Sequence, residues 1–220
     1  LSNLILASPP TMEETFELIE KTISKKPKDT KLLIIWDSIA ATSVQAEMKE
    51  GFDKSHIGVH ARVISQALRK IASKIAEEQV SMLMINQVRT KIGVMFGDDE
   101  ATFGGRAVSF YSSIRIRLKK GKRIAVTGKG KAKEYIGINT TAMIVKNKVA
   151  RPFLEAPLPI YFGLGVHEDM AILDFLTHYG VPRVSGGWKY LDLGGEEVAF
   201  NSGNWSNVLD DHYDAIVDMV

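Results

Sequence analysis

The sequence predicts an α/β fold with a mostly parallel central sheet and an antiparallel hairpin, followed by a small α+β domain. Short apolar runs typical of buried strands alternate with two stretches of helical periodicity. Beyond residue 110, two segments alternate between apolar and polar residues, which favours antiparallel strands. From His167 the composition turns acidic. We therefore expect a core domain over residues 1–165 and a small C-terminal domain over residues 166–220.

The first elements are a buried strand at 3–8 and a helix that ends near Lys25. Thr11 is the expected N-cap of this helix, with Glu14 three residues on as a capping box. The apolar face of the helix consists of Phe16, Leu18, Ile19 and Ile23.

Two further apolar runs predict the centre of the sheet. Residues 31–38 are continuously apolar until Asp37, which is the pattern of a central parallel strand buried on both faces. Residues 44–57 form a mixed loop, and residues 80–86 form the next strand. Between these two segments lies a predicted helix, from about 58 to 78, with an apolar face of Val59, Val63, Ala67, Ile71 and Ile75.

Residues 85–105 leave this strand without any helical or strand period. The segment carries apolar residues among glycines, basic residues and an acidic run: Ile92, Val94, Met95, Phe96 and Phe103. So long a loop inside a compact domain is uncommon, and it is usually either functional or disordered.

The rest of the chain predicts a hairpin and a small module. Strands at 112–120 and 134–148 are joined by a tip at 121–133, and 158–163 forms another strand. The acidic end predicts a helix at about 168–179, strands near 188–192 and 196–200, and a last helix at about 204–219.

The net charge of +2 hides a strong segregation of charge. Residues 111–151 carry 12 basic residues and one acidic residue, whereas residues 152–220 carry 2 basic and 11 acidic residues. The basic block is either a site for a polyanion or a solvated basic hairpin. The acidic module either competes with a polyanion for this block or only balances solubility.

Composition excludes several classes of protein. The chain has no cysteine, which excludes disulfides and thiolate metal sites and is compatible with a cytoplasmic location. No apolar run reaches the ~20 residues that span a bilayer, so we expect no membrane partner. His56 and His60 lie four residues apart, but no further ligand follows in a zinc spacing.

Three groups of residues carry chemistry. Asp37 and Ser38 end a strand, where an acid can hold a metal ion, often through water. Gln87 ends the adjacent strand. Its side-chain amide either senses a terminal phosphate or forms hydrogen bonds only with the backbone. Alternation puts Lys146 and Lys148 on one face, where two cations repel unless a phosphate or open solvent separates them.

Several stretches resemble the RecA recombinase family, in its bacterial and phage-type members. They are LLIIWDSIAA, SHIGVHARVISQALRKIA, INQVRTKIGVMFG, TFGGRAVSFYSSIRIRL and IVKNKVARPF, in the family's order across residues 3–165. The acidic module is similar to the family's C-terminal domain more loosely. The resemblance implies a RecA-like ATPase core that binds ATP and Mg²⁺.

The resemblance also implies roles for the two loops. Residues 44–57 match the first DNA-binding loop and residues 85–105 the second, with Ile57 and Ile92 wedged between base triplets. Amides of Gly93, Gly104 and Gly105 would contact phosphates of single-stranded DNA. The implied DNA-binding residues are Ile57, Gly58, Arg62, Ser65, Arg69, Arg89, Lys91, Ile92, Gly93, Gly104, Gly105 and Arg106.

The nucleotide site is implied in the same way. Asp37 matches the Walker B acid that orders Mg²⁺ through water, with Ser38 beside it. Gln87 matches the γ-phosphate sensor, and we expect Asp37 and Gln87 to be catalytic. Lys146 and Lys148 match lysines that reach the nucleotide of the neighbouring subunit. Phe110 matches an aromatic at the interface of a homo-oligomeric helical filament.

The sequence departs from the family at three places. The phosphate-binding loop G-x-x-x-x-G-K-[ST] occurs nowhere. We therefore expect the C-terminal two-thirds of a recombinase, which by itself hydrolyses no ATP at a useful rate. Arg106 stands in place of Asn.

The third departure concerns the duplex-binding site. Thr141 and Met143 stand in place of its usual basic residues. Lys119 and Lys120, with Lys122, Arg123, Lys129, Lys131 and Lys133, are then expected to bind double-stranded DNA.

We thus expect a protein of DNA recombination and repair, including the SOS response to DNA damage. It would form an ATP-dependent filament on single-stranded DNA and catalyse pairing and strand exchange. A ring-forming motor ATPase, such as a replicative helicase, and a non-enzymatic DNA-binding module are the alternatives.

Overall fold

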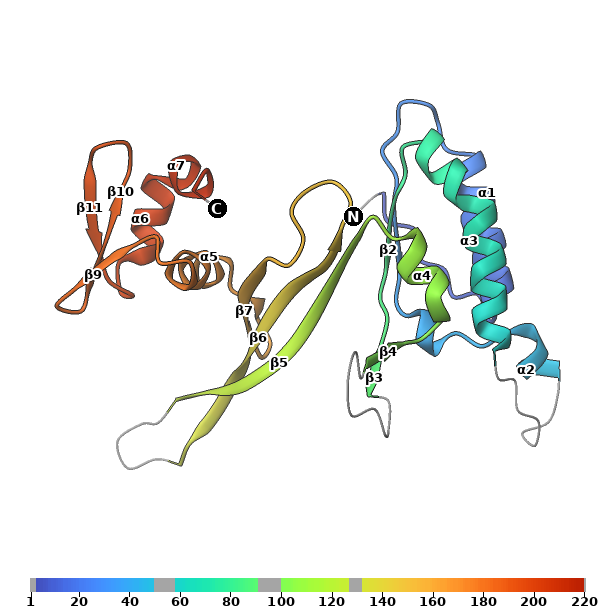
Figure 1. The fold of residues 1–220 in the computed structure, drawn as a ribbon, viewed down its shortest axis with the longest axis horizontal. Helices are drawn as coiled ribbons and strands as arrows, with labels where there is room; N and C mark the ends of the chain where they lie inside the picture. Colours follow the sequence, from blue (N-terminus) through green and yellow to red (C-terminus); the bar gives the residue numbers. More distant parts are fainter. Residues whose placement is uncertain (1–2, 50–57, 91–99, 127–131, 220) are drawn as a thin grey trace. The chain divides into compact units, whose positions relative to one another are not determined.

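The computed structural model describes residues 3–49, 58–90, 100–126 and 132–219 (Figure 1). The chain divides into two compact units, Leu1–Ser112 and Ser113–Val220. The expected domain boundary at 165/166 stays a prediction.

Helix α1 (Met12–Ser24) opens the first unit as its capping residues predict. The Thr11 side chain accepts a hydrogen bond of 3.3 Å from the backbone N–H of Glu14. Its buried stripe consists of Met12, Phe16, Ile19 and Ile23. The prediction is wrong for Leu18, which is 40% exposed because it lies off this stripe.

Strands β1 (Leu33–Trp36) and β2 (Ser81–Met84) pair in parallel, in a register that joins Trp36 to Met84. Ile34, Trp36, Met82 and Met84 pack into a core shared with helices α1 and α3 (Val59–Glu77). On the other face Leu33 is 60% and Leu83 52% exposed. The expected burial of residues 31–38 on both faces is therefore wrong, because the described helices cover only one face.

The strand predicted at 3–8 is also wrong. This segment forms no strand and pairs with none of the described strands, and Ile5 and Leu6 are each 86% exposed. A strand requires a neighbouring backbone for its hydrogen bonds, and the described part of the chain supplies none here.

Helix α3 confirms the long predicted helix, but its fully buried residues are Ile64, Leu68 and Ile71. Several short elements were not predicted. They are the 3₁₀ helix η1 (Ile39–Ala41), α2 (Gln45–Lys49), β3 (Val88–Thr90), β4 (Glu100–Thr102) and α4 (Gly105–Tyr111). Strands β3 and β4 pair antiparallel and flank residues 91–99, which lie outside the described residues.

The second unit begins with an antiparallel sheet in the order β5-β6-β7-β8. Its strands are β5 (Ile114–Val126), β6 (Glu134–Asn147), β7 (Glu155–Tyr161) and β8 (Gly165–Val166). The predicted hairpin is confirmed, and β5 continues six residues beyond its expected end at Lys120. Residues 127–131 of the predicted tip lie outside the described residues.

The acidic segment has a hydrophobic core of its own, which includes Leu176, Leu191, Phe200, Trp205 and Ile216. Its elements are α5 (Glu168–His178), β9 (Arg183–Ser185), β10 (Trp188–Asp192), β11 (Glu197–Phe200), α6 (Trp205–Asp211) and α7 (Tyr213–Val217). The single helix expected at 204–219 is two helices, which meet at His212. Among the described helices, none combines the length and apolar character that crossing a membrane requires.

Candidate nucleotide and nucleic-acid site

The carboxyl edge of the parallel pair gathers three predicted site residues. Asp37 and Ser38 directly follow β1, and Gln87 comes three residues after the end of β2. The backbone N–H of Ile39 donates a 3.1 Å hydrogen bond to the carbonyl oxygen of Ile85, which holds the two strand ends together. Asp37 and Gln87 are exposed and Ser38 is half-buried. This edge of a parallel sheet is where ligands bind in α/β folds.

The donor set at this edge fits magnesium better than zinc. The one carboxylate named there, on Asp37, is a hard oxygen ligand, and Mg²⁺ commonly takes one or two carboxylates together with water and substrate phosphates. Within the described ranges, no cluster of three or more His, Asp or Glu side chains is placed to hold a metal. Asp37 could therefore hold Mg²⁺ only together with further oxygen ligands, such as phosphates.

Asn86 ties the start of the second predicted DNA loop to its end. Its Nδ2 donates a 2.8 Å hydrogen bond to the carbonyl oxygen of Phe103, and its Oδ1 accepts one of 2.8 Å from the backbone N–H of Gln87. The segment that leaves the sheet at Gln87 thus returns to the same strand end at Phe103. Gln87 was predicted as a site residue, but this use of Asn86 was not predicted.

His60 joins the flanks of both predicted loops at the start of α3. Its ring meets the ring of Phe103 edge-on, with centroids 4.9 Å apart. Its Nε2 lies 3.3 Å from Oε2 of Glu47, on α2. The sequence offered no signal for this contact, since His60 was considered only as a metal ligand.

One face of α3 carries the predicted phosphate contacts. Arg62 and Arg69 are exposed and Ser65 is half-buried, at helical spacings that put them on one side. Gly104 and Gly105 pack against the same helix, because a Cβ on Gly104 would lie 2.7 Å from Cδ1 of Ile64 and one on Gly105 3.1 Å from Cβ of Ala61. The structure therefore brings the end of the second loop onto the basic helix.

The remaining loop residues are described only in part. Gly58 is the N-cap of α3, with φ +82°, and Arg106 is exposed in the first turn of α4. Arg89 lies in β3, but its side chain is not described. Ile57, Lys91, Ile92 and Gly93 lie outside the described residues.

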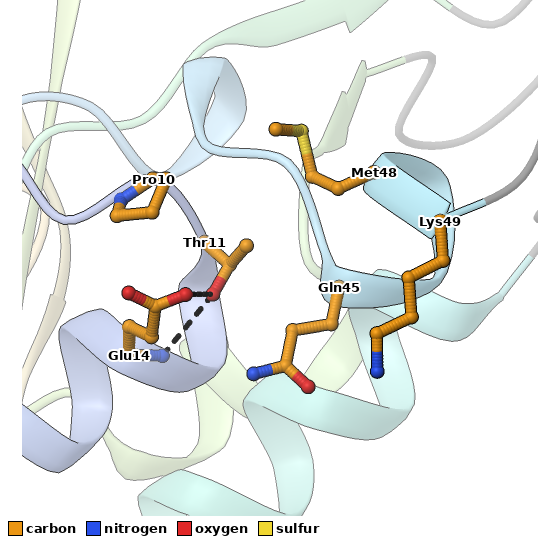
Figure 2. A pocket seen from close by; sticks show the side chains of 6 residues that line it. All are labelled: Pro10, Thr11, Glu14, Gln45, Met48 and Lys49. Carbon is orange, nitrogen blue, oxygen red and sulfur yellow. Dashed lines mark hydrogen bonds between the residues drawn. The ribbon is translucent and has the colours of Figure 1, made fainter.

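A pocket of about 230 Å³ lies where α2 meets the start of α1 (Figure 2). Figure 2 shows Thr11 and Glu14 joined by hydrogen bonds on one side, with Gln45, Met48 and Lys49 on the other. Its lining holds one basic and one acidic residue, so it lacks the excess of cations that a phosphate chain requires. We assign it no part in the nucleotide site.

In the second unit, Lys146 belongs to a group of cations. Arg115 lies directly opposite Lys146 across the β5–β6 ladder. Burial lowers the pKa of Lys146, and the charges of Lys148 and Arg115 lower it further. A phosphate between these side chains would relieve this repulsion. Arg115 was not predicted, although the alternation of IRIRLKK puts it on the face of the other basic side chains.

The rest of β5 carries further basic side chains. Lys119 and Lys120 are exposed and lie opposite Thr141 and Thr140. Arg117 lies directly opposite Met143. Arg117 thus places a cation on β5 next to Met143, the position on β6 where the family usually has a basic residue.

Phe110, the predicted interface aromatic, is 70% exposed at the end of α4. Its ring meets that of Tyr111 edge-on at 5.1 Å. Large apolar side chains this exposed commonly mark contact surfaces when they occur in patches.

Comparison with known proteins identifies relatives of this chain. The family model for the RecA N-terminal domain matches residues 1–167. Protein RecA of Streptomyces ambofaciens is 36% identical over 214 residues, covering 97% of this chain and 55% of the relative. Protein RecA of Syntrophus aciditrophicus is 35% identical over 215 residues, covering 98% and 60%, and that of Petrotoga mobilis is 35% identical over 209 residues, covering 94% and 55%.

The chain thus spans a little over half the length of these curated relatives. The matched region contains the Asp37 edge, both predicted loop flanks and the hairpin. The chain belongs to the RecA family.

Proposed function

We propose that this chain is the DNA-binding part of a recombinase. The complete protein would form a helical filament on single-stranded DNA in the presence of ATP and Mg²⁺. It would pair homologous DNA and exchange strands in recombination and repair.

One observation carries the proposal. The segment from Gln87 to Phe103 begins at the carboxyl edge beside Asp37 and ends on the basic helix α3, with Asn86 fastening both ends. A change at Gln87 would therefore be transmitted to the loop and to the face of Arg62 and Arg69. Such a connection would couple nucleotide binding to the affinity for DNA.

The residues of this chain would have separate roles at the nucleotide. Asp37 would hold Mg²⁺ through water, and Gln87 would donate a hydrogen bond to the terminal phosphate. Lys146, with Lys148 and Arg115, would neutralise phosphates of a nucleotide bound by the neighbouring subunit. The nucleotide would supply the γ-phosphate whose presence Gln87 senses.

We also propose that the chain needs a further segment to hydrolyse ATP, because no G-x-x-x-x-G-K-[ST] loop occurs among its 220 residues. An ATPase assay of the chain with single-stranded DNA is expected to give background turnover. Turnover above background would contradict this part of the proposal.

The DNA contact is tested by salt-dependent binding of the chain to an oligo-dT. Changing Arg62 and Arg69 to Ala is expected to lower the log–log salt slope by about 1.4, at ~0.7 for each lost phosphate contact. The matched control changes Lys25 and Lys28, two exposed lysines at the end of α1 and in the turn after it, to Ala. Equal effects of both pairs, or no binding of the unchanged chain, would contradict the assignment.

A further inference from the structure

His60, in the first turn of α3, contacts one residue of each predicted DNA loop. Its ring meets the ring of Phe103 edge-on, with 4.9 Å between the centroids. Its Nε2 lies 3.3 Å from Oε2 of Glu47, which belongs to α2. The side chain of His60 is 19% exposed and that of Glu47 is 32% exposed, so their contact is partly shielded from solvent. One side chain therefore joins the described parts of residues 44–57 and 85–105.

Glu47 is held in place by the start of α2. The same Oε2 atom accepts a 3.3 Å hydrogen bond from the backbone N–H of Val44, whose side chain is fully buried. The backbone N–H of Gln45 donates a 3.1 Å hydrogen bond to Oε2 of Glu13, on α1. The carboxylate that faces His60 thus belongs to a turn that is anchored to the hydrophobic core and to α1.

Phe103 is held in place at the end of the second loop. Its carbonyl oxygen accepts the hydrogen bond from Asn86, and its backbone N–H donates one of 3.5 Å to the carbonyl oxygen of Gln87. The contact with His60 therefore connects the carboxyl edge of the parallel strands to α2, through residues whose positions are fixed on both sides.

The end of the second loop packs on α3 at three successive residues. Phe103 meets His60, whereas Gly104 and Gly105 each approach an apolar side chain of the helix. An apolar side chain offers no partner to a carboxylate. Of these three contacts on α3, the imidazole is thus the one that also reaches Glu47.

An imidazole suits this place because it combines a flat ring with a nitrogen at the edge of the ring. A leucine would pack against Phe103 but would offer no polar group to Glu47. A glutamine would offer a polar group to Glu47 but no ring to Phe103. His60 and Glu47 by themselves are too few to form a metal site, and the described ranges contain no cluster of three or more such ligands.

We propose that His60 is a positioning residue for the binding of single-stranded nucleic acid. It holds α2 and the end of the second predicted loop on the helix that carries Arg62 and Arg69, so both are in place before the strand binds. Protein segments that are ordered in advance lose less entropy on binding, which raises the affinity. The inference rests on the proposed function, since it takes the two loops as the DNA contact.

The first measurement follows the hydrogen exchange of the backbone amides of Glu47 and Met48 in the 220-residue chain without DNA. These N–H groups donate to the carbonyl oxygen of Val44, at 3.0 and 3.3 Å, so their exchange reports how well α2 is ordered. His60→Leu is expected to speed the exchange by about threefold to tenfold, because α2 loses one stabilising contact. His60→Gln keeps a polar group for Glu47 and is expected to change the exchange by less than about twofold. An unchanged exchange rate in His60→Leu would overturn the inference.

The second measurement is the affinity for oligo-dT over a range of salt concentrations, with each variant checked to be folded. His60→Leu and His60→Gln each break one of the two contacts, so each is expected to weaken binding by about threefold to tenfold. The log–log salt slope is expected to stay unchanged, because neither variant removes a phosphate contact. A residue that only stabilises the fold would lower the urea midpoint and leave the affinity of the folded chain unchanged, and this result would overturn the inference.

A double variant tests whether the contact with Glu47 is responsible. Glu47→Ala in the His60→Leu background is expected to weaken binding by less than Glu47→Ala does alone, because both changes remove the same contact. Losses that simply multiply would overturn the inference. His178→Leu is the matched control, since His178 is an exposed histidine whose ring also meets an aromatic ring, that of Tyr179 at 5.0 Å, but in the acidic module. It is expected to leave the exchange and the affinity unchanged.

Failure of this inference differs from failure of the proposed function. If the salt slope depends on Arg62 and Arg69 but the His60 variants bind oligo-dT as tightly as the unchanged chain, the inference alone is overturned. If the unchanged chain does not bind oligo-dT, the proposed function fails and the inference fails with it.

Discussion

Asn86 and Phe103 are seventeen residues apart in sequence, yet the side-chain amide of the first donates a 2.8 Å hydrogen bond to the backbone carbonyl of the second. This bond closes the base of the second predicted DNA loop. Since Gln87 follows directly, the candidate phosphate sensor and both ends of the loop form one connected group.

Replacing Asn86 by Asp is expected to lower the free energy of unfolding by about 1–2 kcal/mol. The carboxylate keeps an acceptor for the N–H of Gln87 but has no donor for the carbonyl of Phe103. Urea unfolding measures the change. Gln87→Ala is the control and is expected to change stability by at most ~0.5 kcal/mol, because its side chain is exposed. Equal losses for the two variants would show that the Asn86 bond contributes nothing of its own.

A side chain at Gly104 is expected to lower the stability of the chain for two separate reasons. Its φ is +88°, and an added Cβ would lie 2.7 Å from Cδ1 of Ile64. Gly58 has φ +82° but open space around it. Gly58→Ala is therefore expected to cost ~1–2 kcal/mol of stability from backbone strain alone. Gly104→Ala is expected to cost about 1–3 kcal/mol more, from the contact with Ile64.

The companion change Ile64→Val separates the cost of the contact from the cost of backbone strain, because it removes the Cδ1 atom. In the Gly104→Ala background it is expected to recover part of the contact cost and none of the strain. Thermal or urea unfolding of the single and double variants measures both terms. If Gly104→Ala and Gly58→Ala are equally destabilised, the contact with Ile64 is not tight.

Lys146→Met is expected to stabilise the chain at pH 7 while weakening its binding to a triphosphate. A lysine whose pKa falls on folding holds its proton less tightly in the folded state, so its charge costs stability at neutral pH. That cost disappears as the pH rises through the lowered pKa towards 10.5. Loss of a charged hydrogen bond to phosphate is expected to weaken binding by about tenfold to 100-fold.

Urea midpoints measure the stability of the Lys146→Met variant, and titration calorimetry with tripolyphosphate measures its binding. Lys122→Met removes an exposed lysine elsewhere on the same hairpin and serves as the control. A loss of stability, or equal binding losses in both variants, would contradict the assigned phosphate contact.

Glu20→Gln is expected to destabilise the chain at neutral pH and to lose this effect in acid. Hydrogen bonds from Lys70 at 2.5 Å and Lys74 at 2.6 Å lower the pKa of Glu20 from 4.5 to about 2. A carboxyl whose pKa falls on folding contributes stability above its unfolded pKa and loses it as the pH falls to the folded value. The difference between the variant and the unchanged chain is therefore expected to shrink between pH 4.5 and about 2.

Urea midpoints taken from neutral pH down to about pH 2 follow this difference. Glu17→Gln serves as the comparison at neutral pH, since the Glu17–Lys21 pair spans 3.7 Å between side chains that are 63% and 70% exposed. Its expected loss is at most ~0.5 kcal/mol. A stability difference between the unchanged chain and the Glu20→Gln variant that persists at about pH 2 would contradict the assigned cause.

Local sequence determined helices α1 and α3 and the β5–β6 hairpin of this protein. The Thr11–Glu14 cap, the stripe of α1 and the alternation of β5 and β6 depend on residues a few positions apart, so they were predictable. The family stretches and the charge segregation likewise follow from sequence alone, because they require no knowledge of neighbours in space.

Only the tertiary structure decided which distant residues meet. The exposure of Leu18, the coil at 3–8 and the short helices α2 and α4 depend on what packs against each segment. The same is true of the Asn86–Phe103 bond and the His60 contacts. Periodicity predicts which side of an element is apolar, but it does not predict which segment packs against that side. The free energy of burial between elements determines which segments pack together.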